Sequence, residues 1–310
     1  MKPGAFLEDG VYKGISPYEY HSWGLNKERP ENGPISCSQL KDFVNLQPFG
    51  WRHSAPRKSS KAMAWGSLVD SLLFTPGMEE FAFKEDNPDR APSDGAARSR
   101  AAKMWEADRI MEEKTIVYRA LYDEAEIAVE RLKETPASAK ILDGADYQVA
   151  LVHTDPKYQS IPIKGLVDIL PHELDSDDCI ADLKTTSVSL HSDRELQRQI
   201  FKFGYHIQAA LYLMLWNQLT SDYRNRWKII WQKSTPPYEV RVQEFTQEII
   251  ALGEAFIVDE LDYFARCLKT RTFNSYFENG ETYVDLPDWA LLEFDERKER
   301  NALKTYPIVT

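Results

Sequence analysis

Runs of alternating apolar and polar residues predict five β-strands in the second half of the chain. Successive side chains of a strand point to opposite faces, so a half-buried strand alternates with a period of two. Polar turn residues separate the first three runs, at 155–157 and at 175–178. The five predicted strands are 147–154, 159–170, 179–186, 226–233 and 238–245.

Apolar residues spaced three and four apart predict helices before, between and after these strands. Gly204 is expected to break the longest helical segment after the third strand, and Thr75-Pro76-Gly77 ends an apolar helix. The predicted helices are 35–46, 62–74, 98–137, 192–219, 246–268 and one that starts at Pro287, with loops at 52–61 and 85–97.

The order of these elements, helices, three strands, helix, two strands and helix, indicates an α/β or α+β fold. We therefore expect one domain over residues 1–310. Its parts are a mainly helical region at 1–140, an αβ core at 141–270, and a tail at 271–310 with a short helix.

Composition narrows the class of protein. The chain has 310 residues, a mean hydropathy of −0.50, a net charge of −11 and no apolar run long enough to span a bilayer. The start of the chain lacks the apolar centre of a secretory signal, and three scattered cysteines without a CxxC pair favour a reducing, cytoplasmic setting. The acidity argues against a protein that coats nucleic acid with positive charge, but it leaves room for a local basic channel.

The run CIADLKTT at 179–186 places opposite charges in a strand that otherwise reads as core. Asp182 and Lys184 share one face with Ile180, because they are two residues apart. If this strand forms a hairpin with the preceding one, Asp168 lies beside Asp182. Two adjacent carboxylates repel each other unless a cation lies between them, which predicts a site for Mg²⁺ or Mn²⁺. The alternative is an ordinary ion pair at the edge of a strand.

Three segments together resemble the PD-(D/E)XK nuclease superfamily: KGLVD at 164–168, ADLKTT at 181–186 and GYHIQAALY at 204–212. More narrowly, they are similar to exonucleases of the RecE (exonuclease VIII) type from phage and prophage recombination modules. The segment AMAWGSLVDSLLFTP at 62–76 and LPDWA at 286–290 extend the similarity. The resemblance implies a restriction-endonuclease-like core with a mixed central β-sheet flanked by helices and a helical N-terminal layer.

The resemblance also implies roles for individual residues. Asp168 and Asp182 would be the metal carboxylates, Leu183 would offer its backbone carbonyl to the metal, and Lys184 would be the catalytic lysine. Gln208 and Tyr212 match the QxxxY element of RecB-like members, and their spacing places both on one helical face. Gln208 is expected to bond either the catalytic strand or a DNA phosphate, and Tyr212 likewise, so both count as catalytic residues in this reading.

Three positions depart from the pattern of the family. Asp70 stands where a metal-binding histidine is usual, and because aspartate suits Mg²⁺, we expect Asp70 to be a metal ligand. Gln148 replaces a common glutamate in the first strand, and Leu166 replaces a common arginine. The three cysteines also exclude the variant with a four-cysteine iron–sulfur cluster.

The function that the resemblance implies is a Mg²⁺- or Mn²⁺-dependent exodeoxyribonuclease in DNA recombination. Its substrate would be double-stranded DNA ends, resected 5′ to 3′ by a ring-like homo-oligomer that works with a single-strand annealing protein. Two alternatives stay open. One is a structure-specific or CRISPR-adaptation-type nuclease of the same superfamily. The other is a nuclease fold that binds DNA with little or no cleavage, for which Asp70 and Gln148 are the supporting features.

Overall fold

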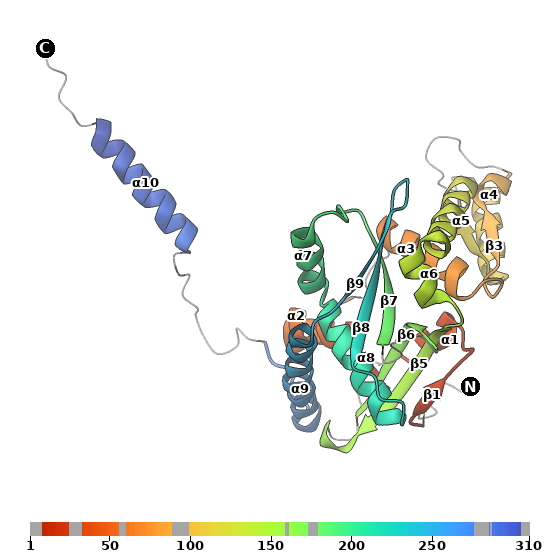
Figure 1. Cartoon of the computed structure of the whole chain (residues 1–310), viewed down its shortest axis with the longest axis horizontal. Coiled ribbons are helices and arrows are strands. Elements are labelled where there is room, and N and C mark those ends of the chain that lie inside the picture. The colour runs from red at the N-terminus through yellow and green to blue at the C-terminus, as the bar shows by residue number, and fades with distance from the viewer. Residues whose placement is uncertain are drawn as a thin grey trace, which may run out of the picture. The chain divides into compact units, whose positions relative to one another are not determined.

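The computed structural model describes residues 8–24, 33–55, 60–88, 99–158, 161–172, 179–275, 285 and 287–304 (Figure 1). It divides into a large unit, Met1–Phe273, and a smaller one, Asn274–Thr310, and each is treated by itself. In the described part, no helix has the length and apolarity that crossing a membrane requires.

A mixed β-sheet forms the centre of the large unit, in the order β1-β5-β6-β7-β8-β9 with β2 attached to β6. β7 and β8 are parallel because the helices α7 and α8 connect them, whereas β5, β6 and β7 are successive antiparallel neighbours. The five predicted strands are confirmed as β5 to β9, and β1 and β2 are additions. The bounds are β1 (Gly10–Tyr12), β2 (Ile35–Ser36), β5 (Asp146–Asp155), β6 (Ile161–Leu170), β7 (Cys179–Thr186), β8 (Arg226–Lys233) and β9 (Val240–Glu244).

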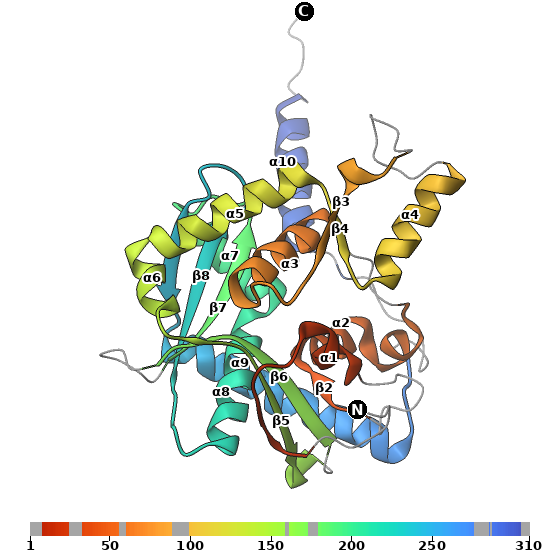
Figure 2. The same cartoon turned by 90° about the vertical axis from the view of Figure 1, so that its right-hand side faces the viewer.

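Helices cover both faces of this sheet, which confirms the predicted fold class (Figure 2). One core forms under α2, α8 and α9 and includes Trp227 and Trp231 of β8, each 1% exposed. The other forms under α3, α5 and α6 and includes Leu183 and Ile230. The bounds are α2 (Cys37–His53), α3 (Lys61–Phe74), α5 (Arg119–Glu134), α6 (Pro136–Leu142), α8 (Tyr205–Leu219) and α9 (Gln247–Thr270).

The remaining elements connect the strands and helices described above or lie beside them. Gly204, with a φ of +63°, ends α7 and precedes α8, so the predicted break is confirmed. β3 and β4 form a small parallel sheet. The bounds are α1 (Pro17–Ser22), β3 (Phe81–Phe83), η2 (Lys84–Asp86), α4 (Arg100–Met111), β4 (Thr115–Val117), η3 (Pro156–Tyr158) and α7 (Asp193–Phe203).

Two predicted helices were wrong in extent. The segment 98–137 is not one helix, because α4 stops at Met111 and the β-branched run Thr115–Val117 pairs with β3. The helix predicted at 35–46 runs on to His53 through a kink, where Gln47 has a φ of +58°. The turn at 175–178 and most of the loop at 85–97 lie outside the described residues, as do residues 56–59 of the loop at 52–61.

In the smaller unit, α10 (Asp288–Lys304) starts where Pro287 predicts a helix. The carbonyl of Pro287 accepts hydrogen bonds from the backbone N–H groups of Ala290 and Leu291. Proline at such a position fixes the chain in a conformation that leads into a helix.

Close packing of α8 against α9 depends on Gly253, which is buried in α9. A Cβ atom there would overlap the carbonyl oxygen of His206 and come within 2.9 Å of the Ala210 Cβ atom, both in α8. We expect Gly253→Ala to lower the free energy of unfolding by about 3 kcal/mol, because the two backbones must separate.

Urea unfolding followed by tryptophan fluorescence measures this effect. Gly50→Ala is the matched control, since Gly50 also lies in a helix but its added Cβ atom meets only an ordinary contact at 3.6 Å. An equal loss of stability in both variants would contradict the packing argument.

Candidate active site

The antiparallel register of β6 and β7 sets Asp168 opposite Asp182. Ile169 pairs with Ala181, and Asp168 and Asp182 are the next residues on the two strands, where their side chains lie within hydrogen-bonding reach of each other. The expected convergence of the two carboxylates is therefore present. The Asp182 charge is among the causes that raise the pKa of Asp168.

β6 changes face at Asp168, which alternation alone does not predict. Val167 packs in the core under α8, but Ile169 belongs to the core under α3 and α5. In a regular strand both side chains would point to the same side, opposite Asp168. The partner strand bends at the same place, where Gln148 has a φ of +50°, a conformation uncommon for residues other than glycine. The Gln148 amide donates a 3.2 Å hydrogen bond to Asp168 Oδ1.

Asp182 is the most buried carboxylate of the site, with 1% of the residue exposed. Two donors converge on it: Lys184 Nζ lies 2.6 Å from Oδ2, and Gln208 Nε2 lies 2.7 Å from Oδ1. Of the two partners expected for Gln208, the strand that carries Asp182 is the one observed. Burial opposes the charge of Lys184, but the Asp182 and Asp168 carboxylates outweigh it and raise the lysine pKa above its ordinary value. Lys184 is thus held as an ammonium in this arrangement.

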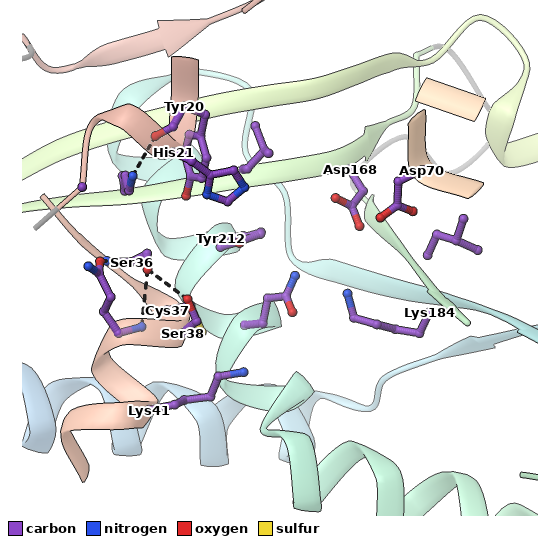
Figure 3. Close-up of a pocket in the computed structure, with 16 residues that line it drawn as sticks. Tyr20, His21, Ser36, Cys37, Ser38, Lys41, Asp70, Asp168, Lys184 and Tyr212 are labelled. Carbon is purple, nitrogen blue, oxygen red and sulfur yellow. Dashed lines mark hydrogen bonds between the residues drawn. The ribbon is translucent and has the colours of Figure 1, made fainter. Parts of the chain in front are cut away.

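Asp70 joins the site from α3. Figure 3 shows its side chain beside that of Asp168, at the wall of a shared cavity. Burial raises the pKa of Asp70 to about 7, although the nearby Lys184 lowers it. Burial is also the largest cause of the raised pKa of Asp168. The raised values mean that ionising both carboxylates here is unfavourable without more positive charge.

The donor set fits a hard divalent cation by its chemistry. One ammonium faces three carboxylates, all ligands are oxygens, and a divalent ion would supply the charge that lets all three ionise. Within the described residues, no three histidine, cysteine or acidic side chains already stand at the spacing of a formed metal site. In the present arrangement Lys184 and Gln208 each bond one oxygen of Asp182, so a bound cation would share this carboxylate with two donors.

The other wall of the cavity is basic, and sequence reasoning missed it. The cavity has a volume of about 420 Å³. Lys164 and Lys41 line it together with the first residues of α2, and Figure 3 shows Lys41 extending into it from α2. Lys164 is the first residue of the KGLVD segment, so its position in that motif could have indicated that it belongs to the site. Lys41 could not have been recognised in this way, because its partner, the carbonyl of Phe203, is remote in sequence.

Tyr212 and Leu183 also line the cavity. The Tyr212 ring packs against β6 at Gly165, where an added Cβ atom would lie 2.9 Å from the ring. Leu166, at the position where arginine is common, packs against the small cluster of Tyr20 and Trp23. The cation at this part of the strand is instead Lys164, whose Nζ donates to the Tyr20 carbonyl at 2.8 Å and lies over the Tyr20 ring.

Lys164 predicts a pH dependence of stability. Burial lowers its pKa to about 8, while an unfolded lysine keeps its proton up to about 10.4. Between these values the unfolded chain binds more protons, so Lys164 makes the free energy of unfolding rise with pH over this window. Lys164→Met removes this contribution. The stability of the variant relative to the parent should therefore fall by about 2 kcal/mol between pH 8 and pH 10.

Urea unfolding of both proteins at several pH values measures this difference. A difference that is constant from pH 7 to pH 10 would contradict the proton linkage at Lys164.

Comparisons with known proteins bear on the fold that holds this site. The sequence profile of a family described as a PDDEXK-like domain of unknown function (DUF3799) matches residues 36–284. A candidate exonuclease of Eubacterium rectale has a similar solved structure, with 15% identity, a TM-score of 0.50 and coverage of 90% of this chain and 98% of that one. A phage-related exonuclease of Haemophilus somnus 129PT is more distant, at 12% identity and a TM-score of 0.34, with 77% of this chain and 96% of that chain covered. No curated protein sequence matches.

Proposed function

Because this chain belongs to the PDDEXK-like family DUF3799, we propose that it is a Mg²⁺- or Mn²⁺-dependent exodeoxyribonuclease. The observation that carries the proposal is the placement of Asp168 opposite Asp182, with Lys184 bonded to Asp182 and Asp70 beside them. Nucleases with PDDEXK domains generally depend on a divalent metal. The exonuclease assignment is supported by the name of the Eubacterium rectale protein, whose fold is similar.

The residues have separate tasks in this proposal. Asp168 and Asp182, with Asp70 and the backbone carbonyl of Leu183, would hold the cation. When bound, the cation would activate a water for attack on the phosphorus and neutralise charge on the phosphate. Lys184, held as an ammonium, stabilises the negative charge that develops on the phosphate oxygens.

Gln208 acts as a positioning residue. Its hydrogen bond to Asp182 Oδ1 fixes the orientation of that carboxylate. Tyr212 lines the cavity one helical turn further on, where its ring shapes the wall beside β6. Both lie on α8, so one helix orients Asp182 of β7 and also packs against β6.

The basic wall supports DNA as the substrate. Lys41, Lys164 and the N-terminal end of α2 face the carboxylates across one cavity, so a phosphodiester could be bound by ammonium groups while the cation site acts on it. The net charge of −11 means that this positive potential is local.

We extend the proposal to biological role on the basis of the resemblance to RecE-type exonucleases. The substrate would be double-stranded DNA ends, resected 5′ to 3′ during recombination, with a single-strand annealing protein as partner. A ring-like homo-oligomer would enclose the duplex and reconcile DNA binding with an acidic exterior. The three cysteines are free and buried, as in proteins of a reducing cytoplasm.

Digestion of end-labelled linear duplex tests the proposal, with Mg²⁺, Mn²⁺ or EDTA and with the label at the 5′ or the 3′ end. We expect metal-dependent release of nucleotides from the 5′ label and no cleavage of a covalently closed circle. Cleavage of the circle would favour an endonuclease of the same superfamily. Binding without cleavage under all metal conditions would favour a DNA-binding protein and overturn the proposed activity.

A further inference from the structure

The end of α7 presents two exposed aromatic rings on either side of a lysine. Phe201 and Phe203 are 47% and 45% exposed, and Lys202 between them is exposed as well. Single apolar residues on a surface are ordinary and need no explanation. This segment differs because contacts connect Phe203 to the candidate active site.

Two contacts make that connection. The Phe203 ring lies 5.7 Å from the ring of Tyr205, and Lys184 Nζ lies 5.2 Å from the centre of that same ring. The carbonyl of Phe203 accepts a 2.7 Å hydrogen bond from Lys41, which lines the cavity. The Tyr205 ring therefore contacts both Phe203 and Lys184, and the Phe203 carbonyl is hydrogen-bonded to Lys41 of the basic wall.

The backbone holds Phe203 in this place. Gly204 follows it with a φ of +63°, a conformation that favours glycine, and α8 starts at the next residue. A Cβ atom on Gly204 would come within 2.7 Å of the Lys41 side chain. The ring is thus presented by the junction of two helices, which fixes its position better than a loop would.

Phe201 is exposed to the same degree but has a different neighbour. Its ring packs against His206, with 5.0 Å between the ring centres. Residues two apart on a helix point in roughly opposite directions, so Phe201 faces away from Tyr205 and the cavity. The pair therefore supplies a test residue and a matched control within one turn of helix.

We propose that Phe203 is a stacking platform for an unpaired nucleobase of the strand whose phosphate lies between Lys41 and Lys184. The proposal rests on the proposed nuclease function. Lysines that follow the phosphates and aromatic rings that stack on bases are the combination by which proteins hold single strands. A base inside a duplex already stacks on its neighbours, so Phe203 receives a nucleotide that has left the helix. Strand separation then occurs at the site.

An abasic-site scan tests the proposal without any catalysis. Short fluorescent single strands, each lacking one base at a different position, are titrated with protein in EDTA, and binding is followed by fluorescence anisotropy. For the parent, loss of the base at one position near an end should weaken binding about tenfold. Phe203→Ala should bind the intact strand about tenfold more weakly and should be insensitive to that abasic site, because the two changes remove the same contact.

Phe201→Ala is the control and should keep the parental response to the abasic site. A second readout uses 5-iodouracil at the sensitive position, with light-induced crosslinking in EDTA and identification of the attached peptide. We expect the crosslink at Phe203, and its loss in Phe203→Ala.

If the parent digests linear duplex with Mg²⁺ but no abasic position couples to Phe203, the stacking role is overturned while the nuclease function stands. If the parent neither binds nor digests DNA, the proposed function itself fails. Coupling to Phe201 in place of Phe203 would also overturn the assignment.

Discussion

Asp182→Asn is expected to lower the rate of metal-dependent DNA digestion by at least about 10³-fold. A metal in a nuclease site stabilises transition-state charge by several kcal/mol, and each 1.36 kcal/mol changes the rate tenfold. Asparagine keeps the size of the side chain but removes the charge that a cation requires. The two donors at Asp182 increase the effect, since an amide must turn its NH₂ group towards either Lys184 Nζ or Gln208 Nε2. One hydrogen bond is then lost.

The loss of this buried hydrogen bond could unfold Asp182→Asn, so Asp168→Asn serves as a second variant. Its amide oxygen can still accept the hydrogen bond from Gln148, and the fold should persist. We expect an equally large loss of activity. Both variants should also lose the rise in melting temperature that Mg²⁺ gives the parent, because binding to the folded state alone stabilises it.

Asp262→Asn is the control. Asp262 forms an exposed ion pair with Arg266 on α9, so its loss should change neither digestion nor the response to Mg²⁺. Parental digestion by a folded Asp168→Asn protein would show that these carboxylates do not bind the catalytic metal.

The centre of the site could be predicted because it depends on short-range geometry. Alternation along β7 puts Asp182 and Lys184 on one face, and the hairpin register with β6 brings Asp168 opposite. The spacing of Gln208 and Tyr212 along one helix is equally local. The relative placement of these residues could be predicted since each relation involves one element or two adjacent strands, whereas their roles were implied by the family resemblance.

The rest of the site depends on contacts between distant segments. Lys41 reaches the cavity only because α2 packs beside the junction of α7 and α8. The change of face at Asp168 depends on the unusual backbone of Gln148 in the neighbouring strand. The periodicity and secondary-structure propensity of a segment do not predict such a contact, because the same residues are equally compatible with a regular strand.

The strand β4 is a different case. Thr115, Ile116 and Val117 are all β-branched and interrupt a helical reading of 98–137. The local composition therefore favours a strand here, but the helix-forming residues on both sides led to the prediction of one continuous helix. Pairing with β3 decides the outcome, and that pairing is itself a contact between segments that lie far apart in the sequence.

Lys184→Ala should change activity and metal binding in opposite directions. In the proposed mechanism the ammonium stabilises developing charge on the phosphate, so its loss should slow digestion by about 10²- to 10³-fold. The same ammonium lies 2.6 Å from Asp182 Oδ2 and so competes with a cation for that oxygen. Without it, Asp182 keeps the hydrogen bond from Gln208 and gains an open oxygen. Mg²⁺ should then bind more tightly.

Two measurements separate these effects: the rate of digestion at saturating Mg²⁺, and the Mg²⁺ concentration that half-saturates the rise in melting temperature. Lys140→Met, an exposed lysine on α6, should leave both at the parental value. Weaker Mg²⁺ binding in Lys184→Ala would mean that the lysine organises the carboxylates instead of competing with the cation. Digestion at the parental rate would show that Lys184 does not take part in the catalytic step. The proposed catalytic strand β7 would then supply no basic residue to the reaction.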